Sequence, residues 1–201
     1  MNKIKFSGFN WILKEGLEIP PGSNNFSAQN IFIDEQGLHL KITNSGSHWI
    51  CSEIYTEDFA KWGEYTFFIS TNVEKLDKNI VAGLFIYQDD QHELDVEFHN
   101  GIASYTIQPN DTKKFKLNLQ GDYSTHKIYF DKNISDFKSI HGHHENHIQN
   151  QINKWQTLKG NRPEPRKSHL HINFWLKNGQ PPVNNKNAEL IIKSIIFKSN
   201  S

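Results

Sequence analysis

The sequence predicts an all-β protein built from two packed antiparallel sheets. Short runs of alternating apolar and polar residues, rich in β-branched and aromatic side chains, recur along the chain. Gly, Asn, Asp and Pro residues separate these runs, and no long segment has the 3.6-residue apolar period of an amphipathic helix. This number of short strands favours two stacked sheets over a small barrel.

The expected strands follow one another along most of the chain. In chain order they are residues 31–34, 38–43, 49–55, 63–70, 80–87, 93–98, 103–108, 115–119, 126–130, 137–141, 169–174 and 189–197. The turn residues of Asp34-Glu35-Gln36-Gly37 predict a hairpin between the first two. Residues 142–167 are rich in His, Asn and charge and contain two prolines, so we expect an irregular excursion there, with a short helix near 148–155.

The composition favours a neutral ligand and one domain with a substantial core. The 201 residues include 22 Lys plus Arg and 22 Asp plus Glu, so the formal net charge is zero. This balance argues against nucleic acid or an acidic membrane as a partner, whereas a sugar polymer is compatible with it. We expect a single domain over residues 1–201 and a monomeric chain.

Cys51 is the only cysteine, so it has no partner for an internal disulfide. A mid-strand thiol without a basic neighbour is also a poor nucleophile.

No apolar stretch is long enough to span a bilayer, and we expect no membrane partner. Residues 1–10 contain lysines without a following apolar run, so the chain as given has no export signal. A secreted protein without its leader and a cytoplasmic protein both agree with this.

The run Glu93-Leu94-Asp95-Val96-Glu97 concentrates acidic residues on one side of an expected strand. Side chains alternate along a strand, so the three acids project from one face while Leu94 and Val96 pack into the core. Three like charges on one face destabilise a purely structural strand, and a catalytic site would explain their presence. The alternative is a solvent-facing strand whose charges repel one another tolerably.

Two of these acids suit retaining glycoside hydrolysis. That reaction needs one ionised carboxylate as nucleophile and one protonated carboxyl as acid, about 5–5.5 Å apart. On a flat strand the Cα atoms of Glu93 and Glu97 would be about 13 Å apart, so the sheet must be concave and the side chains must lean together. Asp95 between them would keep the two glutamates at different pKa values.

The acidic run and several other segments resemble glycoside hydrolase family 16, the laminarinase and lichenase family. Its signature strand, Glu-hydrophobic-Asp-hydrophobic-Glu, is matched throughout residues 93–97. Similar segments stand at Ser52-Glu53, Trp62-Gly63-Glu64-Tyr65, Ser124-Thr125-His126 and Asn173-Phe174-Trp175, and residues 21–26 and 137–143 resemble one bacterial branch of the family. The likeness covers nearly the whole chain.

The resemblance implies a concanavalin-like jelly roll of two curved antiparallel sheets. It implies Glu93 as nucleophile, Glu97 as acid/base and Asp95 as their helper. Glu53 corresponds to an acid that contacts the substrate, and His126 would lie near the cleft. No cofactor is implied, and a structural calcium ion cannot be read from the sequence.

The chain departs from the family pattern where substrate is contacted. Gln91 stands where lichenase-type members commonly have a sugar-stacking Trp, and Tyr55 replaces an Arg. Lys132 and Ser139 replace aromatic residues in the strands after His126. These differences affect the expected substrate and not the expected fold.

Three further residues are candidates for binding sugar. Asn173 and Trp175 are two apart and share a strand face, where an amide can bind hydroxyls and an indole can stack on a pyranose. A core position is the alternative for Trp175, because aromatic residues are common in β-sandwich cores. Gln108 lies on the expected neighbour of the acidic strand, and ordinary surface polarity is its alternative.

A histidine-rich segment suggests a metal site but lacks the spacing of one. His141, His143, His144 and His147 with Glu145 match no helical metal-binding motif, and no cysteine accompanies them. We therefore expect a solvated loop and no metal ligands.

The first functional hypothesis is a retaining endo-acting hydrolase of a β-glucan or β-galactan, with a polysaccharide or oligosaccharide as its partner. The second is a lectin-like carbohydrate-binding protein with little or no turnover. A transglycosylase is a third, because a sugar can intercept the same covalent intermediate in place of water.

Overall fold

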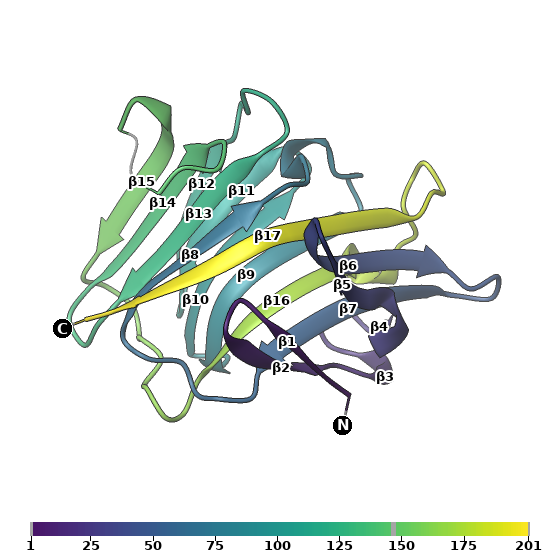
Figure 1. The fold of residues 1–201 in the computed structure, drawn as a ribbon, viewed down its shortest axis with the longest axis horizontal. Coiled ribbons are helices and arrows are strands. Elements are labelled where there is room, and N and C mark those ends of the chain that lie inside the picture. Colours follow the sequence, from purple (N-terminus) through teal and green to yellow (C-terminus); the bar gives the residue numbers. More distant parts are fainter. Residues whose placement is uncertain (1, 146–147, 201) are drawn as a thin grey trace.

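The computed structural model describes residues 2–145 and 148–200, which form two curved β-sheets packed face to face (Figure 1). The first sheet carries the acidic run, and we call it the cleft sheet. In spatial order its strands are β1 (Lys3–Phe6), β2 (Phe9–Leu13), β7 (Trp49–Thr56), β16 (His169–Leu176), β9 (Ile80–Asp89), β10 (His92–His99), β11 (Ile102–Ile107) and β12 (Asp111–Lys116).

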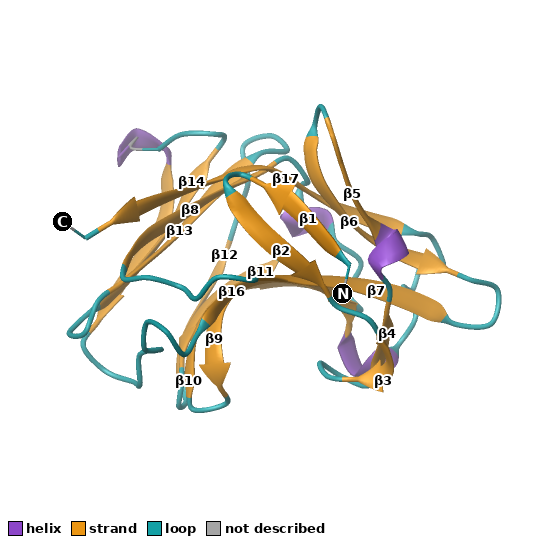
Figure 2. Cartoon of the chain, turned by 60° about the horizontal axis from the view of Figure 1, so that its bottom comes forward, coloured by secondary structure: helices purple, strands orange, loops and turns teal. Residues whose placement is uncertain are grey.

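The second sheet packs against the core-facing side of the cleft sheet, and we call it the outer sheet. In spatial order its strands are β5 (Ile31–Asp34), β6 (Gly37–Asn44), β17 (Ala188–Ser199), β8 (Gly63–Ile69), β13 (Ser124–Phe130), β14 (Ser135–His141) and β15 (Gln151–Thr157). β6 also pairs with β7, which joins the two sheets at one edge. Figure 2 shows the two layers from another side.

A short hairpin closes one end of the cleft sheet. It consists of β3 (Gly16–Ile19) and β4 (Asn24–Phe26), and β4 pairs in parallel with β7. The Asn24 side-chain amide donates hydrogen bonds to the carbonyls of Pro21 and Leu176, which fasten the connecting turn to the end of β16. The hairpin therefore stands beside the outward face of the cleft sheet.

The core lies between the sheets and takes its side chains from the inward positions of each strand. On β10, Leu94, Val96 and Phe98 are completely buried, as the alternation predicts. Tyr105 of β11 stacks on Phe137 of β14, with ring centroids 5.2 Å apart, and so connects the two sheets. The jelly-roll fold class predicted from the sequence is confirmed.

Most of the expected strands are present, and so is the hairpin at residues 34–37. Asp34 pairs with Gly37, and the Gln36 amide donates to the Asp34 carboxylate. Gly37 has φ +133°, and a Cβ there would lie 2.2 Å from the Ile192 carbonyl oxygen, so only glycine fits. The sequence analysis missed β1, β2 and the β3–β4 hairpin, and β12 occupies residues 111–116 in place of the expected 115–119.

The helix expected near residues 148–155 is wrong. A single 3₁₀ turn, Ile148–Asn150, leads into strand β15, which pairs with β14. Ser139 pairs with Asn153 and Ile140 pairs with Gln151, which leaves Ile152 as a bulge. The bulge places Ile152 and Trp155, three residues apart, against the core, and this imitates helical spacing. Among the described residues, no helix is long and apolar enough to cross a membrane.

Candidate active-site cleft

Four neighbouring strands of the cleft sheet place their outward side chains in transverse rows. Residues paired across neighbouring strands share a face of the sheet. One row contains Glu97, Gly83, Asn173 and Glu53; the next contains Asp95, Phe85, His171 and Tyr55; the third contains Glu93, Tyr87 and His169. Apart from His169, the residues of these rows form the floor of a cavity of about 500 Å³.

The cavity brings together most of the residues that the sequence indicated. Its lining includes all three carboxyls of β10 with Glu53, Asn173 and Trp175. One wall is formed by Pro20 and Pro21, in the turn between β3 and β4. Lys14 connects this wall to the floor, because its ammonium donates to the Pro20 carbonyl at 2.7 Å and to Glu53 Oε2 at 2.8 Å.

Burial raises the pKa values of all three carboxyls, and repulsion from neighbouring carboxylates raises those of Glu93 and Asp95 further. For Glu93, burial and then the negative charges of Glu97, Asp90 and Glu53 raise the pKa to about 7, against a hydrogen bond from the Gln108 side chain that lowers it. The pKa of Asp95 is raised well above its usual range by burial and then by the charges of both glutamates. The three groups therefore do not all ionise together at neutral pH.

Glu97 differs from Glu93 in its neighbours. Burial raises the pKa of Glu97, whereas the positive charges of Lys177 and Lys114 lower it. The two glutamates thus lie in distinct electrostatic surroundings on either side of Asp95, whose Oδ1 is buried without a hydrogen-bond partner in the described residues.

Asn173 and Trp175 present polar atoms that the protein itself leaves unpaired. Asn173 Oδ1 and Trp175 Nε1 are both buried, and neither has a partner among the described residues. Since buried polar atoms nearly always have partners, Asn173 Oδ1 is suited to accept a hydrogen bond from a ligand in the cleft and Trp175 Nε1 to donate one to it. Gly83 makes room for the amide, because a Cβ there would lie 2.5 Å from Asn173 Oδ1.

Gln108 and His126 lie away from the cavity lining. Gln108 ends the strand pair beside β10 and acts on the site through its hydrogen bond to Glu93. His126 is completely buried between the sheets, where its ring nitrogens contact the hydroxyls of Ser139 and Ser124. Burial lowers the pKa of His126 to about 3, so the ring is a neutral core side chain. The expectation that His126 lies near the cleft is wrong.

An aromatic floor was missed at the sequence level. His171 stacks between Tyr55 and Phe85, with centroid distances of 5.3 and 4.8 Å, and Tyr87 meets it edge-on at 5.8 Å. His171 Nδ1 also lies 3.3 Å from Glu53 Oε1. His171 lies two residues before Asn173 and four before Trp175 on β16, so its side chain projects from the same face of the strand. This alternation could have identified His171 as a cleft residue.

The histidine-rich segment has structural contacts where it is described. His143 Nε2 contacts the Ile69 carbonyl, and its ring stacks on Tyr123 at 4.7 Å. His147 lies outside the described residues. Within the described part of the chain, no group of three His, Cys, Asp or Glu side chains could hold a metal ion. Cys51 is fully buried, and burial raises the pKa of its thiol to about 12.

Comparison with known proteins gives matches in structure and not in sequence. No model of a protein family matches the sequence, and no curated protein matches it. The Bacillus licheniformis β-glucanase is similar in structure, with a TM-score of 0.71 at 16% identity over 94% of this chain and 92% of the other. A lichenase derived from a mouse hindgut metagenome gives 0.72 at 16% identity over 94% and 93%.

A third similar structure contains sugar. It is a mixed-linkage glucan GH16 protein of Bacteroides ovatus in complex with a G4G4G3G product, with a TM-score of 0.68 at 11% identity over 94% of each chain. This chain has the fold of the family 16 glycoside hydrolases. The structural likeness extends over nearly the whole chain, as the sequence resemblance predicts.

Proposed function

We propose that this chain is a retaining glycoside hydrolase that cleaves a β-linked polysaccharide, a β-glucan or a β-galactan. The observation that carries the proposal is the set of three partly buried carboxyls, Glu93, Asp95 and Glu97, on the floor of a cleft large enough for sugar units. The glucanase fold and the glycan complex of the Bacteroides ovatus protein support a carbohydrate ligand.

In the proposed reaction, the Glu93 carboxylate attacks the anomeric carbon and forms a covalent glycosyl-enzyme intermediate. Glu97 donates its proton to the leaving glycosidic oxygen, and then removes a proton from the water that hydrolyses the intermediate. Asp95, which lies between the two glutamates, stays protonated, because burial and the charges of both glutamates raise its pKa well above the usual range. A neutral Asp95 separates the two glutamates without adding a third charge.

The rest of the cleft suits a pyranose chain. Tyr55, His171 and Phe85 stack on one another along the floor, and together they give it an apolar surface against which the C–H groups of a pyranose can pack. The unpaired Asn173 Oδ1 and Trp175 Nε1 can accept from and donate to sugar hydroxyls, respectively.

Release of reducing ends from a glycan panel tests this proposal. The panel contains β-1,3-, β-1,4- and mixed-linkage glucans, xyloglucan, agar and carrageenan. We expect the wild-type chain to cleave at least one of them, and Glu93→Gln and Glu97→Gln to lose about 100-fold to 10,000-fold in rate. Glu35→Gln removes a carboxylate from the exposed 34–37 turn and serves as the matched control with an unchanged rate.

Two other outcomes distinguish the alternatives. No product from any glycan, with binding that persists in Glu93→Gln, would contradict the hydrolase and support a carbohydrate-binding protein. Longer products on addition of an acceptor oligosaccharide, lost in Glu93→Gln, would show transglycosylation through the same intermediate.

A further inference from the structure

A second cavity adjoins the cleft at its Glu97 end. It measures about 270 Å³ and shares Glu97 and Trp175 with the main cleft. Its floor continues the row pattern of the cleft sheet, since Ile102, His99, Val81 and Trp175 pair in register across β11, β10, β9 and β16. A polymer that lies along the cleft can therefore continue into this cavity.

Two exposed lysines flank the second cavity. Lys114 on β12 pairs with Ser104, which in turn pairs with Glu97, so the three share one transverse row. Lys177 lies in the 3₁₀ turn Lys177–Gly179 that follows β16. Both lysines line the cavity, and neither forms an ion pair within the described residues.

The two lysines differ from the lysine that neutralises an acid in the main cleft. Lys14 makes a direct 2.8 Å contact with the buried Glu53 and is fixed by the Pro20 carbonyl. Lys114 and Lys177 act on Glu97 only through longer-range attraction, and their ammonium groups keep all their hydrogen-bonding capacity. A pair of free cations at the mouth of a cavity is suited to an anion.

The remaining lining is suited to a sugar ring. The His99 side chain hydrogen-bonds to the Lys78 backbone, while its Nε2 is buried without a partner among the described residues. Burial and the charge of Lys177 lower the pKa of His99, so Nε2 is a hydrogen-bond acceptor for a hydroxyl at neutral pH. Ser104 adds a hydroxyl group, and Trp175 adds an aromatic face.

We propose that this cavity binds a sugar unit with a negatively charged substituent, a sulfate ester or a uronate carboxylate, in the polysaccharide that occupies the cleft. The inference rests on the proposed function and specifies its substrate class as an anionic β-glycan. Lys114 and Lys177 contact the charged group, while His99 and Trp175 contact the ring that carries it.

Calorimetric titration tests the inference without turnover, on the full chain with Glu93→Gln. The probes are laminarin oligosaccharides and agarose oligosaccharides, each unmodified, chemically sulfated and oxidised at C6 to the uronate. We expect at least one charged form to bind 10-fold or more tightly than its unmodified counterpart. Adding Lys114→Gln and Lys177→Gln together should reduce that ratio at least 10-fold. Comparison of the sulfated and oxidised probes identifies the anion.

The matched control removes two other exposed lysines, Lys5 on β1 and Lys193 on β17, neither of which lines the cavity. Lys5→Gln with Lys193→Gln changes the net charge equally and should preserve the ratio. An equal loss in both double variants would overturn the inference, because general attraction would then explain the binding. Equal affinity for charged and unmodified probes, or no binding of any charged probe, would overturn it too.

Failure of the inference is distinguishable from failure of the proposed function. Products from neutral glycans, with no lysine-dependent preference for charged probes, would retain the hydrolase and remove the anionic substrate. No products from any neutral or charged glycan would contradict the hydrolase whatever the lysine variants bind.

Discussion

At the scale of single residues, the raised pKa of Glu93 lowers the stability of the folded protein at neutral pH. Glu93 is held where burial and neighbouring acids raise its pKa from the ordinary 4.5 to about 7. Below pH 4.5 both the folded and unfolded states carry the proton. Between pH 4.5 and 7 the unfolded chain releases the proton while the folded chain retains it, so the free energy of unfolding falls as the pH rises.

We therefore expect Glu93→Gln to be more stable than the wild type at pH 8, by about 3 kcal/mol, because a shift of one pKa unit corresponds to about 1.4 kcal/mol. The advantage should shrink as the pH falls and disappear near pH 4.5. Urea unfolding of both proteins from pH 4.5 to 8 measures it. A stability difference that does not change with pH would contradict the assigned cause.

Gly83 permits the position of Asn173, and Gly83→Ala tests this. The added Cβ would lie 2.5 Å from Asn173 Oδ1, a side-chain atom that can move away, so we expect little change in stability. The displaced amide should lower kcat/KM about 10-fold, through the loss of one hydrogen bond to substrate of about 1.4 kcal/mol. In a double-mutant cycle, Gly83→Ala should add nothing to Asn173→Ala, and additive losses would show that Gly83 acts by another route.

The candidate site could be predicted along a strand but not across strands. Alternation alone places Glu93, Asp95 and Glu97 on one face, because it is a local property of the backbone. Which side chains lie beside them depends on strand order, and so Phe85 and Tyr87 of β9 were missed. The composition did not predict the charge distribution in the cleft either. A net charge of zero is compatible with unpaired lysines at one end of it.

The prediction for His126 was wrong because this residue lies on the inward face of β13. Residues Ile128 and Phe130 share the parity of His126 on β13 and are fully buried, and this apolar pattern identifies the inward face. The expectation of a cleft position rested on the family resemblance, whereas the hydroxyls of Ser124 and Ser139 serve to satisfy a buried imidazole.

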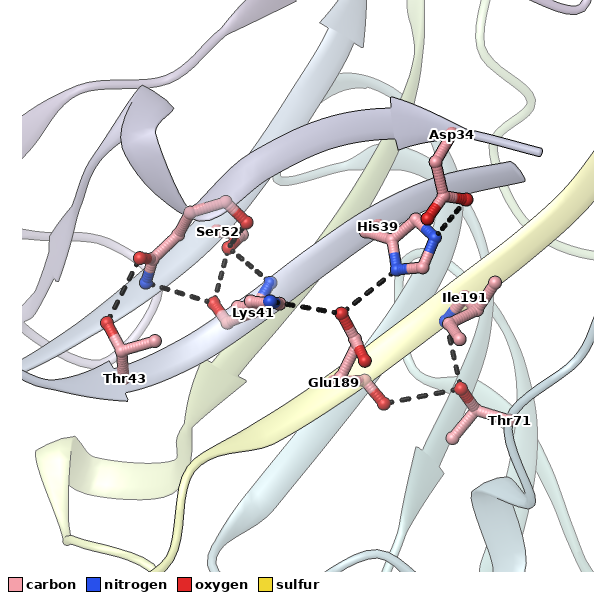
Figure 3. A network of polar contacts seen from close by, with 9 residues as sticks. Asp34, His39, Lys41, Thr43, Ser52, Thr71, Glu189 and Ile191 are labelled. Atoms are coloured by element: carbon pink, nitrogen blue, oxygen red, sulfur yellow. Dashed lines mark hydrogen bonds and ion pairs between the residues drawn. The ribbon is translucent and has the colours of Figure 1, made fainter. Parts of the chain in front are cut away.

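At the scale of elements, a polar network fastens β5, β6 and β17 on the side of the outer sheet away from the core (Figure 3). His39 of β6 is almost fully buried and stacks on Phe32, with centroids 4.4 Å apart. Its ring nitrogens lie 2.8 Å from Asp34 on β5 and 2.9 Å from Glu189 on β17. One side chain therefore connects three strands.

We expect His39→Ala to lower the free energy of unfolding by about 2 kcal/mol, because it removes two hydrogen bonds to carboxylates and a buried ring. Lys41→Gln on the same strand is the control: it removes an exposed 3.4 Å contact with Glu189 and an ammonium 4.6 Å from the centroid of the Phe32 ring, so it should cost less than about 1 kcal/mol. Thermal unfolding of both variants measures the difference. Equal effects would indicate that the His39 contacts contribute no more than a surface ion pair.

The elements missed from the sequence have local explanations. β1 and β2 form a hairpin whose turn, Ser7-Gly8, has φ of 51° and 83°, and a two-residue turn of this kind is a recognisable signal. β15 was obscured by its bulge, which changes the alternation that identifies a strand. The regular strands of the core were predictable because their alternation is uninterrupted.

At the scale of the whole molecule, the two sheets share one core, and this bears on the predicted single domain. The buried cluster runs without interruption through both sheets. Phe137 of the outer sheet is fully buried against Tyr105 of the cleft sheet, whose hydroxyl donates to Ser139 of the outer sheet at 2.7 Å. Neither sheet has a separate apolar interior, so neither is expected to fold alone.

We therefore expect cooperative unfolding, with coincident denaturant transitions by far-ultraviolet circular dichroism and by tryptophan fluorescence. The fluorescence reports on both sheets, because Trp11 lies on β2 and Trp155 on β15. Phe137→Ala should lower the free energy of unfolding by about 3–5 kcal/mol and move both transitions together. A split fluorescence transition, or a shift of only one probe, would show that the two sheets are separate folding units. The cleft sheet would then hold the three carboxyls in place without support from the outer sheet.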